Sequence, residues 1–506
     1  MELEPDIISP TVVSATFTPD QTRMPFLESL MIEKAHRPIS FHMPGHKGTK
    51  APHSLLLEYF GGDLHPADLV EINKNIDYLH SPRGALLEAQ KLAAVAYNAD
   101  HTFFLINGST VGNMAAIMGV TASNQKIIMS RASHRSVYGG IVLSGAIPVY
   151  IEPDYHPDIG FPLSVSVEAI EVLLKQHPDV VAIHLTSPNY YGVMPDIAAI
   201  CHLAHSHGVA LLVDEAHGSH LGFHSDLPQS AVSLRADIIV HSTHKTQGSL
   251  TQSAMLHVND NGFVNLARLA QVLPLLQSSS PSSILLASLD ATRMQMATEG
   301  RERLSIVIAL ARKARDAIRQ MNGLWCYGDE LIGVNNIFAF DPSKLIIRVS
   351  DAGFSGFEAS SLLRHQYEIE VEFADVKHVI CSITIADTES TVDKLLDALH
   401  SLTRQKRPII DHDDFSIKPP DGLPLPAINL RDAYLSTKTR TIPLNEAVGH
   451  ILVENVIPYP PGVPLLVAGE IMEQRHLDYM RYLIDKGSTI IGMEDLSLQT
   501  IRILDA

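Results

Sequence analysis

The stretch ADIIVHSTHKTQGSLTQ, residues Ala236 to Gln252, decides the fold class of this chain. Its apolar run, Ile238 to Val240, ends in a polar segment that contains Lys245. A buried strand that ends at a polar loop is the usual location of active groups in an α/β protein. A lysine there can be the amine that forms a Schiff base with an aldehyde, but most lysines that follow a strand are solvated loop residues. The role of Lys245 therefore depends on its neighbours in the fold.

Upstream of this stretch, short apolar runs alternate with segments of helical period. A helical segment from Leu86 to Asn98, for example, is followed directly by a strand from His101 to Ile106. Such alternation predicts an α/β fold with a mostly parallel sheet that is covered on both faces. Because the carboxyl ends of parallel strands meet at one edge, the residues at these ends should converge. In chain order the predicted strand ends carry Ser109 and Thr110, His134, Tyr190 and Tyr191, Asp214 and His217, and Lys245.

Composition excludes several classes of function. Among 506 residues, 38 are Lys or Arg and 56 are Asp or Glu, and the resulting net charge of −18 repels nucleic acid and anionic membranes. No apolar run is long enough to cross a bilayer, and the start, MELEPDIISP, lacks the regions of a signal peptide. Three scattered cysteines indicate a reducing compartment. We therefore predict a cytoplasmic protein of two or three domains that binds neither nucleic acid nor membrane.

Two other functions can be suggested from the histidines and acidic residues. The tetrapeptide DEAH, Asp214 to His217, also occurs in nucleic-acid helicases, but those need a G-x-x-x-x-G-K-[ST] loop, and this chain lacks even a Gly-Lys dipeptide. A metal site is the second alternative, but no cysteine or clear carboxylate completes a ligand set, so we predict no metal. The two histidine clusters concerned are His217, His220 and His224, and His202, His205 and His207.

A pyridoxal phosphate site accounts for most of the strand ends at once. Asp214 would pair with the pyridine nitrogen and keep it protonated, so that the ring can accept electrons from the Cα atom of the substrate. His134 would stack on one face of the ring, and His217 would lie beside it. The strand–turn–helix segment at Ser109 also fits a phosphate cradle, although a simple helix cap is the alternative. The residues predicted to hold the phosphate are Ser109, Thr110, Ser242 and His244.

Six segments together resemble the bacterial Orn/Lys/Arg decarboxylases, from about Phe41 to Ile484. They are HSTHKTQGSLTQ, LLVDEAHGSHLGFH, FFLINGSTVGN, SRASHRSVY, FHMPGHKG and PYPPGVPLLVAGE. The resemblance, which is to the short arginine/lysine decarboxylases of polyamine synthesis, implies a PLP-dependent aminotransferase-like fold. It implies Lys245 as the Schiff-base lysine, Asp214 as the ring-nitrogen partner and His134 as the stacking residue. It also implies a homodimer or a higher homo-oligomer with active sites at the subunit interface. Gln247 departs from the family, in which this position is often apolar.

The predicted organisation has a large domain, a small one and a C-terminal extension. A long helix is expected from about Arg303 to Met321 and should end the large domain, and a stretch rich in Pro and Asp should form a linker. The predicted parts are an N-terminal arm with the FHMPGHKG loop (1–60), a PLP-binding large domain (61–323), a small α+β domain (324–404), the linker (405–426) and a C-terminal domain (427–506).

The predicted reaction is decarboxylation of a basic amino acid, preferentially arginine to agmatine and CO2. Lysine and ornithine remain alternatives, because all three substrates share the headgroup. An aminotransferase or lyase on the same fold would need an arginine for the substrate carboxylate, and Arg348 is a candidate. An inactive homologue that acts as a binding partner is the rival of another class, and the intact set around Lys245 argues against it.

Glu470 is the candidate for recognition of the substrate's distal cation. A buried cation needs a counter-charge, and the proline-bent segment PYPPGVPLLVAGE ends in this carboxylate. The alternative is that Glu470 caps a helix that starts at Ile471, where the helix dipole favours a negative charge.

Overall fold

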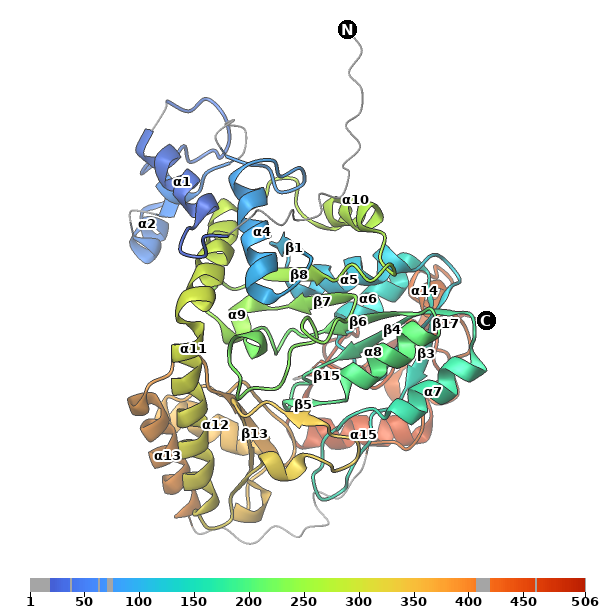
Figure 1. Ribbon diagram of the computed structural model, residues 1–506. Coiled ribbons are helices and arrows are strands. Elements are labelled where there is room, and N and C mark those ends of the chain that lie inside the picture. Colours follow the sequence, from blue (N-terminus) through green and yellow to red (C-terminus); the bar gives the residue numbers. More distant parts are fainter. Residues whose placement is uncertain are drawn as a thin grey trace.

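The sheet predicted around Lys245 is present as seven strands in the order β1-β8-β7-β6-β4-β2-β3 (Figure 1). β8 runs antiparallel to both of its neighbours, and the other strands share one direction. The carboxyl ends of β2, β4, β6 and β7 therefore meet at one edge. The bounds are β1 His101–Leu105, β2 Lys126–Ser130, β3 Ile147–Ile151, β4 Val180–Thr186, β6 Ala210–Asp214, β7 Ile238–His241 and β8 Ala254–Val258.

This computed structural model describes residues 19–36, 39–61, 64–70, 76–405, 419–459 and 462–505. Part of the predicted N-terminal arm (1–18), most of the predicted linker (406–418) and the two prolines of PYPPGVPLLVAGE at 460–461 lie outside the described residues. Among the described helices, none has both the length and the apolar character that a bilayer crossing requires.

Helices cover both faces of the sheet, as the alternation of apolar runs with helical segments in the sequence predicts. Ile127 and Met129 of β2 pack in one core with α5, α6 and α10, whereas Ile128 points to the opposite face and packs with α7 and α8. The α/β fold class is thereby confirmed. The helix bounds are α5 Gly108–Val120, α6 Arg135–Ser144, α7 Val167–Gln176, α8 Ile197–Ser206 and α10 Leu266–Leu276.

The longest of the described helices, α11 Ser283–Arg319, runs from the large sheet to the small one (Figure 1). Its N-terminal half packs with α1 Pro25–His36 and α4 Ala85–Tyr97, and its C-terminal half packs in the core of the small sheet. The predicted start near Arg303 is wrong. The helix begins in the serine-rich segment because Ser282 is its N-cap and accepts a hydrogen bond from the backbone N–H of Leu285.

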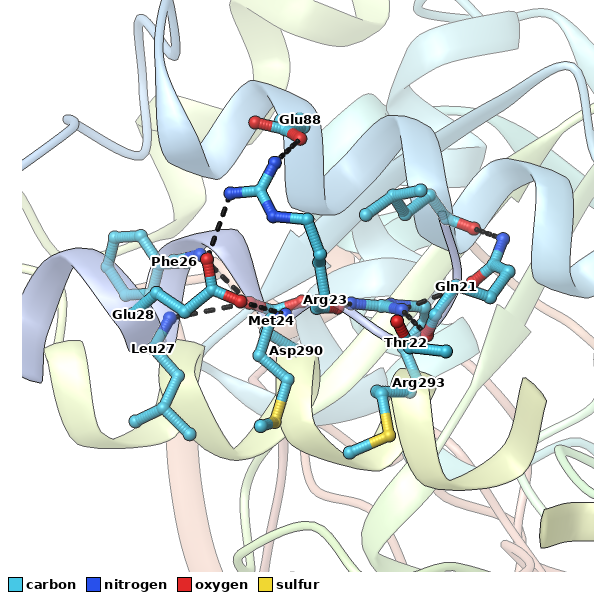
Figure 2. Close-up of polar contacts among 12 residues, drawn as sticks. Gln21, Thr22, Arg23, Met24, Phe26, Leu27, Glu28, Glu88, Asp290 and Arg293 are labelled. Carbon is cyan, nitrogen blue, oxygen red and sulfur yellow. Dashed lines mark hydrogen bonds and ion pairs between the residues drawn. The ribbon is translucent and has the colours of Figure 1, made fainter. Parts of the chain in front are cut away.

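The start of α1 is fixed to α11 by two buried charged residues (Figure 2). Asp290 accepts hydrogen bonds from the backbone N–H groups of Phe26 and Leu27, at 2.9 and 3.3 Å. Arg293 pairs with Asp290 at 2.7 Å and donates to the backbone oxygen of Gln21 at 2.9 Å. Both charged side chains are fully buried. The N-terminal segment therefore has a defined attachment before it continues into the FHMPGHKG loop.

A four-stranded antiparallel sheet, in the order β12-β13-β11-β9, forms the small α+β layer. Helices α12 and α13 pack on it together with α11. Lys344 is the first residue of β11, at the end that faces the large sheet's active residues. The bounds are β9 Trp325–Cys326, β11 Lys344–Arg348, β12 Phe373–Ala374, β13 His378–Ser382, α12 Gly356–Tyr367 and α13 Glu389–Thr403.

The described residues of the C-terminal segment include two strand pairs and two α-helices. Leu430 and Ala433 of α14 and the nearby Val467 and Ala468 pack in the same core as α5 and α6, so this segment lies against the large domain. The bounds are α14 Leu430–Tyr434, β14 Thr439–Pro443 paired with β17 Thr500–Leu504, β15 Ile457–Tyr459 paired with β16 Thr489–Ile491, and α15 Gln474–Asp485. Shorter elements are α2 Ser54–Phe60, α3 Leu64–Ala67, and β5 Val193–Met194 paired with β10 Ala339–Phe340.

Candidate active site

Lys245 lies in α9 Thr243–Thr246, a single turn that follows the end of β7. Its Nζ atom is 3.1 Å from Nε2 of His217. The lysine remains open to solvent, but protein surrounds it densely, and this desolvation lowers its pKa, whereas the Asp214 carboxylate acts in the opposite direction. An amine with a lowered pKa is neutral at a lower pH and is a better nucleophile there.

Asp214 and His134 are joined by a buried hydrogen-bond network. Asp214, at the end of β6, accepts from Asn113 Nδ2 at 2.8 Å and from the backbone N–H of Ala216 at 3.1 Å. The same Asn113 amide donates to Ser136 Oγ at 3.0 Å, and Ser136 contacts His134 Nδ1 at 2.8 Å. The network fixes the carboxylate and the imidazole relative to each other. Burial raises the pKa of Asp214, although the Lys245 cation opposes this shift.

His134 is the N-cap of α6, and its Nδ1 atom accepts the backbone N–H of Ser136. The ring is therefore oriented by the start of the helix that follows it. Burial lowers the pKa of His134 to about 4, and the cations of Lys245 and Arg135 contribute to the shift. A Cβ atom at Gly462 would lie 3.9 Å from His134 Cδ2, so the C-terminal segment closely approaches this ring.

His217 contacts charged side chains that come from α9, from β11 and from the residue before β12. Besides Lys245, it contacts Lys344 Nζ, which is 3.2 Å from its Nδ1 atom, and Glu372 Oε1, which is 3.3 Å from the same atom. The ring of Tyr190 packs edge-on against it, with a centroid distance of 5.3 Å. Burial, together with the two lysine cations, lowers the pKa of His217 to about 3, so the imidazole is neutral at physiological pH.

The residues predicted to hold a phosphate lie on two elements in direct contact. Ser109 and Thr110 are in the first turn of α5, whose N–H groups have no acceptors within the helix. A Cβ atom at Gly112 would lie only 2.5 Å from Val240 Cγ1, so α5 crosses β7 at contact distance. Ser242, just beyond β7, is fully buried, and its Oγ atom has no hydrogen-bond partner among the described residues.

His244 is held differently from the hydroxyl residues. Its Nδ1–H group donates to the backbone oxygen of Ser253 at 2.8 Å. Its Nε2 atom is the one that remains for a ligand. Burial lowers the pKa of His244, and in the neutral ring with Nδ1 protonated the Nε2 atom accepts a hydrogen bond and donates none.

Glu470 has a partner inside the chain. Its Oε2 atom is 2.9 Å from Arg131 Nη2 and also accepts the backbone N–H of Val467 at 2.8 Å. Burial raises the pKa of Glu470, against the attraction of Arg131. The alternative that Glu470 caps a helix at Ile471 is wrong, because α15 begins at Gln474 and Glu473 is its N-cap. The predicted contact with the substrate stays a prediction.

The remaining sequence candidates have structural partners. Arg348 lies at the opposite end of β11 from Lys344 and pairs with Asp351 at 2.8 Å. Glu215, the residue after Asp214, contacts His241 at 2.7 Å and points away from Asp214, because successive side chains of an extended chain point to opposite faces. In the part of the chain that the structure describes, no group of three or more His, Cys, Asp or Glu side chains is arranged to hold a metal ion.

Gln247 is buried and makes hydrogen bonds through both the oxygen and the nitrogen of its amide. The hydroxyl of Tyr97 donates to Gln247 Oε1 at 2.7 Å, and Gln247 Nε2 donates to the backbone oxygen of Ser219 at 2.6 Å. Through the bond from Tyr97, helix α4 is thus hydrogen-bonded to the residue that follows the turn carrying Lys245.

Sequence reasoning missed four residues of this site. Asn113 carries a signal that could have been used, since it is an amide in a helix otherwise built of small and apolar residues. Ser136 lies within the quoted SRASHRSVY segment, but only the structure shows its contacts. Lys344 starts β11 of the small sheet and Glu372 directly precedes β12, and nothing in their local sequence indicates that they approach His217.

Comparisons with known proteins identify the family of this chain. The family model for the Orn/Lys/Arg decarboxylase major domain matches residues 24–391, and the model for the C-terminal domain of the same family matches residues 422–495. An arginine decarboxylase of Bacillus anthracis is 38% identical over 485 residues, which cover 96% of this chain and 98% of the relative.

Solved structures show the same fold at lower identity. The constitutive lysine decarboxylase of Escherichia coli matches with a TM-score of 0.82 at 19% identity, over 96% of this chain and 82% of the other. A ureidoglycine–glyoxylate aminotransferase of Bacillus subtilis matches 63% of this chain and 84% of its own, with a TM-score of 0.51 at 13% identity. The fold is thus aminotransferase-like, and the chain belongs to the Orn/Lys/Arg decarboxylase family.

Proposed function

We propose that this enzyme uses pyridoxal phosphate to decarboxylate arginine, with agmatine and CO2 as products. The observation that carries the proposal is the meeting of Lys245, His217, Asp214 and His134 at one edge of the sheet. The choice of arginine rests on the relative from Bacillus anthracis, which covers nearly the whole chain. The likeness to a lysine decarboxylase structure supports the fold alone at 19% identity.

The residues present fit the cofactor. The buried Asp214 carboxylate, fixed by Asn113, suits a protonated ring nitrogen. The buried Ser242 hydroxyl lacks a partner among the described residues, and the open first turn of α5 presents Ser109 and Thr110. These O–H groups and the backbone N–H groups of α5 would hold a phosphate as donors. His244 would donate to it only as a protonated imidazole, because its Nδ1–H group already donates to Ser253. His134 offers an imidazole face whose orientation is set by the start of α6.

Each side chain has a distinct task in the reaction. When bound, pyridoxal phosphate supplies an aldehyde for an amine and a ring that withdraws electrons from Cα. Lys245 supplies the amine that holds the cofactor between turnovers, and its Nζ atom can return a proton once the carboxylate has left. Asp214 keeps a positive charge on the ring side of the site, because a buried carboxylate is stabilised by a nearby cation. His217, neutral and 3.1 Å from Lys245 Nζ, orients that amine.

Rival reactions on this fold are less well supported. An aminotransferase retains the substrate carboxylate and needs a free arginine to bind it. Arg348, the candidate for that role, pairs with Asp351 and lies close to the hydroxyl of Tyr327. Lysine and ornithine remain alternative substrates, because they share the reacting headgroup with arginine.

We propose a homodimer as the working assembly, in a cytoplasmic pathway of polyamine synthesis. Large apolar side chains are exposed along the N-terminal segment and the FHMPGHKG loop, which is unusual for a surface that faces only water. A second copy of the chain would cover them. The most exposed are Phe41 (95%), Ile39 (88%), Tyr59 (82%) and Ile32 (70%).

Product analysis with arginine, lysine and ornithine in competition tests the function. Agmatine and CO2 in equal amounts, without keto acid, are expected, and the Lys245→Ala variant is the matched control. Cadaverine or putrescine as the main product would move the assignment to lysine or ornithine. Keto acid in place of CO2 would show an aminotransferase.

A further inference from the structure

Lys344 is a buried lysine that reaches the site from the small sheet. It is 1% exposed, and its Nζ atom lies 3.2 Å from His217 Nδ1. The aliphatic part of the side chain passes Gly192, where an added Cβ atom would lie 3.0 Å from Lys344 Cγ. Gly192 also has φ +84°, a conformation that favours glycine. The absence of a side chain at position 192 thus leaves room for the aliphatic part of Lys344, whose Nζ atom reaches the imidazole.

The hydrogen bonds around Lys344 determine which of its neighbours accept. A lysine ammonium has three N–H donors and no acceptor. Its Nζ atom lies 2.7 Å from Glu372 Oε2, 2.6 Å from Ser382 Oγ and 3.2 Å from His217 Nδ1. Ser382 donates its own proton to Glu372, so its oxygen is free to accept from Lys344. The three donors therefore have three acceptors, and His217 Nδ1 is one of them.

An imidazole nitrogen that accepts a hydrogen bond carries no proton. If Nδ1 of neutral His217 accepts from Lys344, the ring proton is on Nε2, which faces Lys245 Nζ at 3.1 Å. An N–H group at that distance can donate only to a nitrogen with a free lone pair. The amine of Lys245 has such a lone pair when it is uncharged, and that is the form in which it attacks an aldehyde.

We propose that Lys344 and Glu372 are positioning residues that keep the proton of His217 on Nε2, so that this N–H donates to the uncharged amine of Lys245. Glu372 accepts a hydrogen bond from the Lys344 ammonium and orients it, and the ammonium in turn donates to Nδ1 of His217. The inference rests on the proposed function for the identity of Lys245 as the reacting amine.

Other charged and titratable groups around the amine do not impose this arrangement. Asp214, at the end of β6, attracts a charged Lys245, and His134 is a neutral ring from the start of α6. Tyr190 packs on His217 through its ring, and its hydroxyl has no partner among the described residues.

The competing tautomer has one acceptor available. Glu372 Oε1, at 3.3 Å from Nδ1, could accept a proton placed on that nitrogen. This arrangement would set the N–H of His217 against the N–H groups of Lys344, and one donor of the ammonium would lose its acceptor. Removing Lys344 abolishes that conflict. His217 should then donate to Glu372, and its bare Nε2 should favour a charged Lys245.

The experiment measures the reactivity of Lys245 in the full-length chain freed of cofactor. Acetic anhydride is applied across a range of pH, and acetylation of Lys245 is followed by peptide mass spectrometry. Lys175, whose side chain is 64% exposed on α7, is the internal reference. In Lys344→Met the apparent pKa of Lys245 should rise by about one unit, so acetylation below that pKa should slow about tenfold.

Two further variants separate the tautomer from a simple effect of charge, because removing the Lys344 cation alone also raises the pKa of Lys245. The double variant Lys344→Met/Glu372→Gln removes one positive and one negative charge, so the net charge near Lys245 is unchanged. It also replaces Lys344→Met as the test if that single variant fails to fold. Acetylation should stay slow in this double variant. In a His217→Phe background, the effect of Lys344→Met should be smaller than with His217 present.

A wild-type rate in the double variant, or an equal effect of Lys344→Met in both backgrounds, would overturn the proposal. These outcomes are independent of the substrate. If the wild-type protein fails to decarboxylate arginine while the acetylation pattern holds, the proposed function fails and the positioning role stands.

Discussion

Replacing Glu470 by glutamine tests what the buried pair between the large domain and the C-terminal segment does. The side chains of Arg131 and Glu470 are 10% and 2% exposed, so their charges are poorly screened by solvent. Glutamine keeps the volume and an acceptor oxygen for the N–H of Val467. Hydrogen bonds to charged groups contribute about 1.5–3 kcal/mol and neutral ones about 0.5–1.5 kcal/mol. Glu470→Gln should therefore lower the free energy of unfolding by about 1–2 kcal/mol.

Glu470→Ala should cost more, about 3–5 kcal/mol, because it leaves the Arg131 charge buried with neither a counter-charge nor a hydrogen-bond acceptor from this residue. The assay is the midpoint of thermal and urea unfolding, followed by circular dichroism, beside steady-state kinetics with arginine. Glu473→Gln is the matched control, since Glu473 pairs with Arg475 and its side chain is 32% exposed. A double variant with Arg131→Met should be less destabilised than the sum of the single changes.

The opposite pattern would refute this reasoning. If Glu470→Gln unfolds at the wild-type midpoint while kcat/KM for arginine falls tenfold or more, the carboxylate serves the distal group of the substrate and not the ion pair. An unchanged kcat/KM with the expected loss of stability would remove Glu470 from substrate recognition.

Further outcomes are expected for other parts of the molecule. Lys245→Ala should fold normally yet lose nearly all turnover and the visible absorption of bound cofactor; substantial residual decarboxylation contradicts its role. Asp214→Asn should still bind cofactor but decarboxylate very poorly, and a near-wild-type rate would mean that another group protonates the ring. Asp290→Ala should loosen the start of α1 and speed proteolysis near Phe26, whereas unaltered cleavage would contradict the anchor. Burial lowers the pKa of His184 to about 4, below its unfolded value of about 6.5. The unfolded chain therefore binds the extra proton, and this residue should remove roughly 1 kcal/mol of stability per pH unit as the pH falls from about 6.5 towards 4. In His184→Gln the melting temperature should fall less steeply as the pH is lowered through that range. A slope identical to that of the wild type would contradict a lowered pKa for His184.

The strand ends of the large sheet could be predicted from the sequence, because parallel strands place their carboxyl ends on one edge whatever the loops do. That rule is sufficient to predict that Lys245, Asp214 and His134 lie near one another. It could not supply Lys344 or Glu372, since they reach the site by packing of a second sheet whose orientation no local pattern records. The domain boundaries at 323, 404 and 426 stay predictions.

The predicted starts of α11 and α15 differ from the observed ones because the sequence does not show which residue is the N-cap. The serines before α11 have the composition of a turn, and a turn-forming serine is also a good N-cap, so the helix started earlier than expected. At the C-terminal end, two acidic residues, Glu470 and Glu473, stand before the apolar period of α15, and either could have been its cap. The partner of Glu470, Arg131, lies far away in the sequence, which explains why the sequence alone could not choose between them.

The contact between Tyr97 and Gln247 has an evolutionary consequence. Both side chains are buried, and the glutamine oxygen is the acceptor of the tyrosine hydroxyl. An apolar residue at position 247 would leave that hydroxyl unsatisfied, at a cost of about 1–3 kcal/mol. Phenylalanine at position 97 would relieve the cost. Across a set of homologues these two positions should therefore coevolve, with tyrosine accompanying glutamine and phenylalanine accompanying an apolar residue.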